Sequence, residues 1–315
     1  MAKKSDRRNN PAWYHKVMLE MLWAICRVLN YSPRWFRFGV LQPIIVAMLR
    51  MVRYRRKTIL SNIENSFPEK SHAENISIMR GYYRILGEII VNTICLAGAT
   101  PKRDGDVIEW VNGKEHIERN KGRDWIALAS HFGCWEYYPL WGWNDPDCHF
   151  MCVYHPLTNV VFELFYRRLR KFSTNVSTVT MAETVRHYLR CRSDKYTTVL
   201  GLVSDQSPRL QADTMWFDFL NRKTAFIEGG ERLAMKFGVP VYFADVSRLA
   251  AGRYSCKFIE IFDGEESVEP GEIRRRYVEH LERMIRREPE LWMWSHKRWK
   301  HSPESQRAKF GTSSL

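Results

Sequence analysis

Apolar runs and amphipathic stretches alternate along most of the chain, and their spacing predicts a mixed α/β fold. Short runs rich in β-branched or aromatic residues are typical of buried strands, and apolar residues recurring every three or four positions are typical of helices. Strands are predicted at residues 107–112, 124–130, 196–204, 239–247 and 254–262, the last alternating in polarity like an edge strand. Helices are predicted at residues 62–92, with a break at Phe67-Pro68 and a new start at Ser71-x-x-Glu74, and at 160–171, 182–191, 230–237 and 272–287. Because strands and helices alternate, we expect a mostly parallel central sheet flanked by helices.

Two apolar stretches near the N-terminus, residues 13–29 and 38–49, lie among basic residues. A helix that spans a membrane needs about 20 mainly apolar residues. The first stretch reaches that length only by including several charged residues, and the second is too short and contains Pro43. We therefore expect helices that lie on a bilayer or dip into it, with the basic residues at the headgroups. Two core helices of a soluble domain are the alternative.

Positive charge is concentrated in the same region. Residues 1–57 hold 13 basic and two acidic residues, so they carry +11 of the formal net charge of +14. Such a region suits a nucleic acid, an anionic membrane or an acidic protein, and composition alone does not separate these partners. With 45% hydrophobic and 27% charged residues, the chain is neither disordered nor a polytopic transporter. The predicted organisation is a basic, membrane-associated helical region at residues 1–57 followed by one α/β domain at residues 58–315.

The seven cysteines are odd in number and include no Cys-x-x-Cys pair. This favours a reducing, cytosol-facing location over a disulfide scaffold. Cys148, His149, Cys152 and His155 form the one metal-like cluster in the sequence, but their spacing is not that of a standard zinc site. We therefore expect no metal.

Polar residues follow two of the predicted strands, at the sheet edge where α/β proteins bind ligands. His131 follows the strand at 124–130, with Glu136 five residues further on, and Asp205 and Gln206 follow the strand at 196–204. If Gly133 supplies a bend, the imidazole of His131 can fold back onto Glu136, whose carboxylate would fix the tautomer and leave the other nitrogen free as a base. The pattern suits removal of a proton from a hydroxyl that attacks an acyl carbonyl, without a covalent intermediate. For an isolated pattern of this kind, the alternative is a structural core histidine.

Several ordered blocks extend the pattern beyond this pair. They are Tyr54–Lys57 leading to Asn62 and to Ser66–Lys70 (SFPEK), Ala127–Glu136 (ALASHFGCWE), Arg167–Arg170 (RRLR), Gly201–Gln206 (GLVSDQ), Gly230–Ala244 (GERLAMKFGVPVYFA) and Met293–Trp299 (MWSHKRW). Together, from about Tyr31 to Trp299, they resemble the lipid A late acyltransferases, the lauroyl and myristoyl transferases within the lysophospholipid acyltransferase superfamily. One position departs from that pattern, because Cys134 stands where the family commonly has Asn.

The resemblance implies an enzyme on the cytoplasmic face of the inner membrane of a Gram-negative bacterium. It would move a fatty acyl chain from acyl carrier protein to a hydroxyl of a lipid A precursor, without a cofactor and without a nucleic acid partner. By the same resemblance His131 is the base and Glu136 its partner. The substrate-binding candidates are Arg168, Arg170, Asp205 and Gln206. Two alternatives remain: a sister acyltransferase acting on an aminolipid, glycerolipid or glycolipid, and a basic membrane-binding protein that is not an enzyme.

Overall fold

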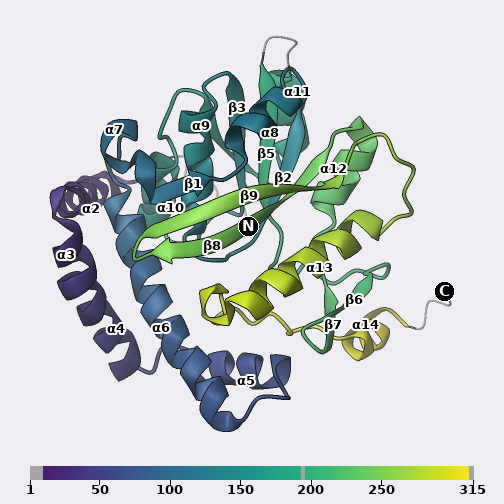
Figure 1. Cartoon of the computed structure of the whole chain (residues 1–315), viewed down its shortest axis with the longest axis horizontal. Helices are drawn as coiled ribbons and strands as arrows, with labels where there is room; N and C mark the ends of the chain where they lie inside the picture. Colours follow the sequence, from purple (N-terminus) through teal and green to yellow (C-terminus); the bar gives the residue numbers. More distant parts are fainter. Residues whose placement is uncertain (1–9, 193–195, 312–315) are drawn as a thin grey trace.

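A mostly parallel sheet forms the centre of the computed structural model, which describes residues 10–192 and 196–311 (Figure 1). Within these residues the sheet has seven strands in the order β1-β9-β8-β2-β5-β3-β4. Five neighbours, from β8 to β4, run parallel, whereas β9 is antiparallel to β8 and parallel to β1. The strands are β1 (Ile108–Trp110), β2 (Trp125–Ala129), β3 (Cys148–Tyr154), β4 (Val176–Thr180), β5 (Thr197–Val203), β8 (Val241–Ala250) and β9 (Arg253–Phe262). The predicted α/β class is therefore confirmed.

Helices surround this sheet, and a small antiparallel hairpin, β6 (Trp216–Phe219) with β7 (Arg222–Ala225), lies outside it. The longer helices are α2 (Trp13–Tyr31), α4 (Gln42–Met51), α5 (Arg56–Ser66), α6 (His72–Cys95), α10 (Val160–Leu169), α11 (Thr184–Cys191), α12 (Gly229–Phe237), α13 (Glu272–Arg287) and α14 (Pro303–Phe310). The shorter ones are α3 (Arg34–Phe36), α7 (Pro101–Asp104), α8 (Gly113–Arg119) and α9 (Trp141–Asn144), with a π-helical turn at Arg37–Leu41 and 3-10 turns at Gly105–Val107, Trp135–Leu140 and Pro289–Leu291.

The predicted elements match this arrangement in most places. The break at Phe67-Pro68 is present, and Ser71 begins α6 with a capping box in which its side chain and that of Glu74 each accept the other's backbone N–H. The prediction of an edge strand at residues 254–262 was wrong, because β9 lies between β1 and β8. Strands β3 and β4 were not predicted.

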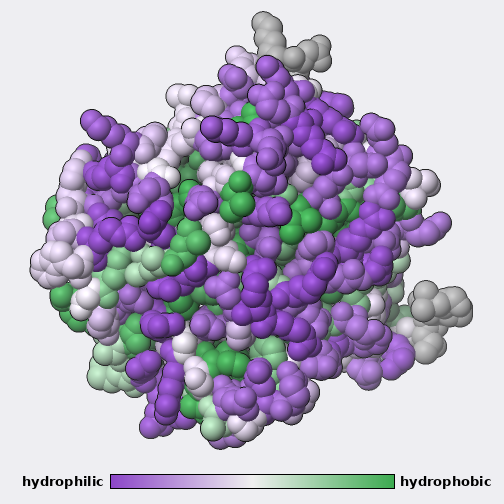
Figure 2. Space-filling model, viewed as in Figure 1, coloured by the Kyte–Doolittle hydropathy of each residue, from purple (hydrophilic) through white to green (hydrophobic). Residues whose placement is uncertain are grey.

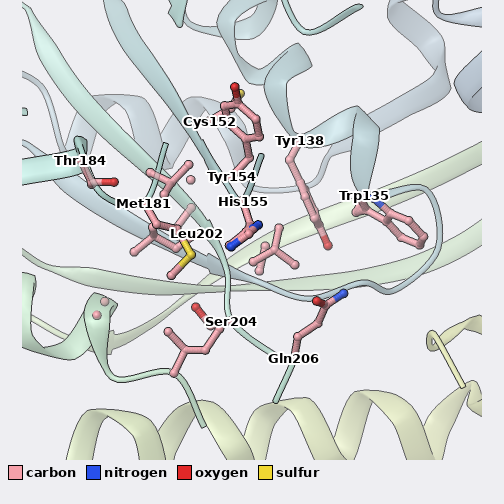
Figure 3. Close-up of a pocket in the computed structure, with 18 of the residues that line it drawn as sticks. Trp135, Tyr138, Cys152, Tyr154, His155, Met181, Thr184, Leu202, Ser204 and Gln206 are labelled. Atoms are coloured by element: carbon pink, nitrogen blue, oxygen red, sulfur yellow. The ribbon is translucent and has the colours of Figure 1, made fainter. Parts of the chain in front are cut away.

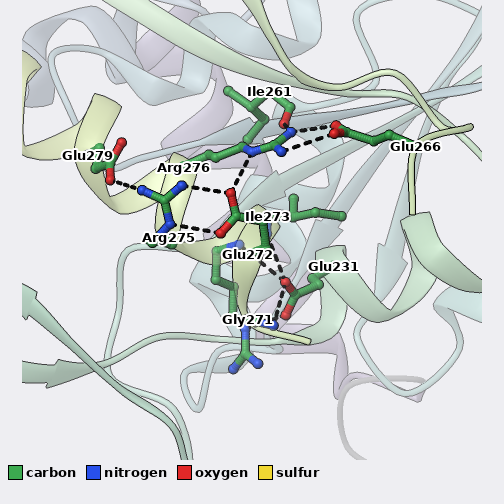
Figure 4. Close-up of polar contacts among 10 residues, drawn as sticks. Glu231, Ile261, Glu266, Gly271, Glu272, Ile273, Arg275, Arg276 and Glu279 are labelled. Atoms are coloured by element: carbon green, nitrogen blue, oxygen red, sulfur yellow. Dashed lines mark hydrogen bonds and ion pairs between the residues drawn. The ribbon is translucent and has the colours of Figure 1, made fainter. Parts of the chain in front are cut away.

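A buried carboxylate fixes the position of α12 against α13 (Figure 4). Glu231 of α12 is 2% exposed and accepts the backbone N–H groups of Gly271 and Ile273 at 3.0 Å each, at the start of α13. The same carboxylate binds the guanidinium of Arg274. Because the first N–H groups of a helix have no partners within it, this contact both caps α13 and ties it to α12. The start of α12 is thereby fixed, which matters because its first residues line the cavity described below.

The N-terminal helices form one side of the molecule. Helix α4 packs against α6, and α2 packs against α6 and α10. Their outer surface keeps large apolar side chains in solvent: Trp13, Val17, Met21, Val28, Trp35, Ile44, Met48 and Met51. Figure 2 shows apolar residues at the left edge, where Figure 1 places these helices. In the described part of the chain no single helix has the length and hydropathy to cross a membrane, and one pair bent by 92°, Arg34–Met51 with Arg56–Ser66, meets those criteria only when combined.

Candidate active site

A cavity of about 940 Å³ lies against the central sheet, beside the ends of β2 and β5 (Figure 3). Small residues of neighbouring strands, Ala127, Gly201 and Ala244, line it together with the rings of Trp110, Phe150 and Phe258. Figure 3 shows Met181 and Thr184 on one side of the cavity and Trp135 on the other. A cavity of this size and apolar lining is at the upper end of the range for small-molecule sites, about 300–1,000 Å³.

His131 lies in the wall of this cavity, two residues after the end of β2. Its Nδ1 is 2.6 Å from Oδ1 of Asp205, and its backbone N–H donates to Oδ2 of the same carboxylate at 3.0 Å. The chain turns away at Gly133, whose φ of +57° and contact with the Tyr254 ring, 2.6 Å from where a Cβ would lie, require glycine.

The register of the sheet explains why His131 and Asp205 meet. Strands β2 and β5 are parallel neighbours, and Ala129 lies opposite Val203. Two residues beyond that pair, His131 and Asp205 leave the sheet at the same edge, although 74 residues separate them in sequence. His131 and Asp205 therefore lie at the predicted edge of the sheet, but His131 contacts Asp205 and not the predicted Glu136.

Asp205 is held as a carboxylate. It is 2% exposed, and besides the two bonds from His131 it accepts the indole N–H of Trp292 at 2.8 Å. Burial alone would raise the pKa of Asp205, but the charge of His131 and the three N–H donors outweigh it and hold that pKa below its ordinary value. With Nδ1–H donated to Asp205, the Nε2 lone pair of His131 is available. The amide nitrogen of Gln206 lies 3.2 Å from it and also lines the cavity.

Glu136 binds Arg170 instead of His131. The predicted contact with the imidazole is wrong: both oxygens of Glu136 accept N–H groups of the Arg170 guanidinium, at 2.8 and 2.6 Å. Glu136 lies in the short 3-10 turn after His131, and Arg170 caps the end of α10. Burial would lower the pKa of Arg170, but the charge of Glu136 and its hydrogen bonds hold it above the ordinary value. Both residues line the cavity, so they belong to the site as a bidentate ion pair.

Arg168 lies elsewhere. Its guanidinium pairs with Glu20 at 2.7 Å and lies 4.3 Å from the centre of the Trp23 ring, both in α2. It is absent from the cavity lining, whereas Arg170 is present. Because the two arginines are two residues apart at the end of α10, they point in different directions. Arg170 faces the cavity, and Arg168 attaches α10 to α2.

A segment that follows α13 supports His131 and Asp205, and the sequence did not predict this role. Phe132 and Trp292 form an antiparallel bridge, with Gly133 N–H donating to the Leu291 carbonyl at 2.9 Å and Met293 N–H to the His131 carbonyl at 3.1 Å. Asn62 of α5 holds this segment from the other side by donating to the Trp294 and His296 carbonyls. The segment therefore fixes the His131 backbone while its Trp292 indole fixes Asp205. A conspicuous signal was available, namely the tryptophans in the block Met293–Trp299 and beside it.

The cysteines near the site are protonated thiols. Burial raises the pKa of Cys134 well above its ordinary value and that of Cys152 to about 12. Neither is therefore an activated nucleophile. All seven cysteines, which lie within the described residues, are free. Strand β3 separates members of the metal-like cluster seen in the sequence, Cys152 and His149. Cys152 faces the cavity, and His149, three residues away along the strand, points to the other face of the sheet.

The comparisons with known proteins point to one family. The family model described as bacterial lipid A biosynthesis acyltransferase matches residues 2–301, nearly the whole chain. The search of curated proteins found no match.

Proposed function

Because the chain belongs to the bacterial lipid A biosynthesis acyltransferase family, and is therefore an acyltransferase, we propose that it moves a fatty acyl chain from acyl carrier protein to a hydroxyl of a lipid A precursor. The observation that carries the catalytic part is the His131–Asp205 pair in the wall of a large apolar cavity. We assign His131 as the general base and Asp205 as its partner, in place of Glu136.

The proposed reaction is direct. Nε2 of His131 takes the proton from the acceptor hydroxyl as its oxygen attacks the thioester carbonyl, and Asp205 stabilises the imidazolium that forms. Collapse of the tetrahedral intermediate breaks the C–S bond, and the imidazolium returns the proton to the leaving thiolate. Since the acceptor hydroxyl must reach Nε2, it displaces the amide of Gln206, which lies at that position without substrate. No covalent enzyme intermediate is needed, in keeping with the protonated state of Cys134 and Cys152.

Apolar and charged parts of the cavity suit different parts of the substrates. The floor of Ala127, Gly201 and Ala244, closed by Trp110 and Phe258, accommodates the acyl chain. Arg170 offers a positive charge in the same cavity for a carbonyl or phosphate oxygen of a substrate. Glu136 is then a positioning residue, because it holds the guanidinium in a bidentate geometry.

We further propose that residues 1–57 bring the enzyme to the cytoplasmic face of the inner membrane. The exposed apolar surface of α2 and α4 and the +11 charge of this region support binding to an anionic bilayer. Acyl carrier protein and the phosphates of a lipid A precursor are both acidic, so the same charge also attracts both substrates.

Two experiments test the proposal. The purified protein, assayed with acyl carrier protein thioester and lipid A precursor, should lose nearly all turnover as His131→Ala, whereas His72→Ala, at an exposed histidine on α6, should retain it. Mass spectrometry of lipid A from a strain lacking the gene should show one acyl chain fewer. Full activity of the His131→Ala enzyme would exclude the mechanism. An unchanged lipid A with another lipid altered would instead identify an aminolipid, glycerolipid or glycolipid as the acceptor.

A further inference from the structure

Three potential metal ligands converge between strand β3 and helix α11. His149 comes from β3, and His187 and Cys191 come from α11. Each offers one ligand atom, and these atoms all lie within 4.8 Å of one another. His149 alternates along β3 with Phe150, whose ring lines the cavity, and His149 itself is not among the residues that line it. This group is separate from the catalytic pair.

The spacing of the two α11 residues suits ligation. His187 and Cys191 are four residues apart, so they lie on the same face of the helix, one turn from each other. The third residue, His149, comes from another element, β3. All three side chains are half-buried, which leaves a path for an ion from solvent.

The polar atoms of the group have few partners. Nε2 of His187 is buried and has no hydrogen bond among the described residues. Nε2 of His149 has a single contact, with the hydroxyl of Ser177 at 3.0 Å. A buried polar atom without a partner is uncommon and costs free energy. A bound cation would satisfy both imidazoles at once.

We propose that His149, His187 and Cys191 bind one Zn²⁺, with water in the fourth position. Two imidazole nitrogens and one thiolate are a donor set that zinc prefers, and three protein ligands with one open position are common in zinc proteins. On binding, Cys191 loses its proton to solvent, and its thiolate bonds the metal. Zinc–ligand bonds of about 2.0–2.3 Å need a small contraction of the present group, which side-chain rotation supplies.

The ion would fasten α11 to β3. Because Thr184 and Val185, in the first turn of α11, line the cavity, the metal would stiffen one wall of the acyl site from behind. No step of the proposed acyl transfer needs the metal, and the experiments that test the metal site do not depend on that activity.

Metal binding is measured first on the full-length protein after treatment with a chelator. Titration with Zn²⁺ should reach one equivalent per chain, and Co²⁺ in its place should give a thiolate-to-metal charge-transfer band. Cys191→Ser and His187→Gln should each weaken Zn²⁺ binding by at least about tenfold, the smallest loss expected when even a residue supporting a metal site is removed. The matched controls Cys26→Ala and His72→Gln should bind as the wild type does. Binding that is unchanged in both site variants would overturn the proposal.

The reactivity of Cys191 provides a second readout. Six of the cysteines are buried, and Cys191 is half-exposed, so it should react fastest with iodoacetamide in the folded protein. One equivalent of Zn²⁺ should slow this alkylation at least about tenfold, because the metal occupies the thiolate that would attack. Zinc should also raise the Tm of the wild type and leave that of Cys191→Ser unchanged. Alkylation of Cys191 at the same rate with and without Zn²⁺ would refute the site.

Discussion

Replacing Asp205 by Asn tests the proposed catalytic pair most directly. Oδ2 of Asp205 accepts two fixed N–H groups, from the His131 backbone and the Trp292 indole, and Oδ1 accepts the imidazole Nδ1–H. An asparagine has one oxygen, which must stay where the two fixed donors are. Its NH2 group then points at Nδ1, and that nitrogen can only accept.

The consequence is the wrong tautomer. With Nδ1 accepting from the asparagine, the proton moves to Nε2, the atom that must remove the hydroxyl proton. We expect kcat to fall by about 10³–10⁴-fold, the size of loss seen when a serine-protease histidine is held in the wrong tautomer, or about 4–5 kcal/mol in the barrier.

The assay measures kcat for acyl transfer as a function of pH. Asp213→Asn, at an exposed position, is the matched control and should behave as the wild type does. Circular dichroism establishes that the Asp205→Asn protein is folded. Activity within tenfold of the wild type in the folded variant would show that Asp205 does not set the tautomer of His131.

Four further predictions follow from other parts of the molecule. Trp292→Phe keeps an aromatic ring but removes one N–H donor from Asp205. Since a hydrogen bond to a charged group is worth about 1.5–3 kcal/mol, we expect kcat to fall about tenfold or more. An unchanged kcat would show that the indole contributes only by packing. Gly201→Ala would place a Cβ 2.6 Å from the Phe150 ring and push that ring into the cavity. In competition assays with thioesters of different length, the preference of the enzyme should shift toward shorter acyl chains, by about fourfold for each methylene excluded. An unchanged preference would show that the acyl chain binds elsewhere. Burial, and then the charge of Arg119, lower the pKa of His116 to about 4, so between pH 6.5 and 4 the unfolded chain binds a proton that the folded protein does not bind. The free energy of unfolding should therefore fall by about 1.4 kcal/mol per pH unit over this range, about 3 kcal/mol in all. In urea unfolding, His116→Leu should lose this slope, and the same slope in the variant would refute the prediction. Met48→Glu puts a charge on the exposed apolar surface of α4 and should weaken binding to anionic vesicles by about tenfold or more, whereas equal binding would exclude that surface as the contact.

Local patterns in the sequence predicted those helices and strands whose own residues carry the signal, such as a helix cap or a continuous apolar run. The capping residues Ser71 and Glu74 and the apolar run of β2 are examples. Strand β4 was missed because its residues, VSTVT, are half polar and half-buried. Strand β3, CHFMCVY, was missed because it has one β-branched residue and no regular alternation of apolar and polar positions. Buried strands of this kind depend on neighbours for stability, so composition alone predicts them poorly.

Except for Arg168, the residues predicted for the candidate site gather at one place, but their pairing differs from the prediction. His131, Glu136, Arg170, Asp205 and Gln206 all line or adjoin one cavity. Which acid contacts which base depends on the order of strands in the sheet, and no local spacing reports that β2 and β5 are neighbours. Five residues between His131 and Glu136 suggested a contact, yet the parallel register brings Asp205 closer from 74 residues away.

The bridge between Phe132 and Trp292 has a consequence for the order in which activity arises during synthesis. A nascent chain already holds the base and its acid once residue 205 has left the ribosome, but the tryptophan and the backbone contacts that align them arrive some ninety residues later. We expect a ribosome-bound chain halted before Trp292 to contain a sheet with both groups present and to transfer no acyl chains until translation resumes.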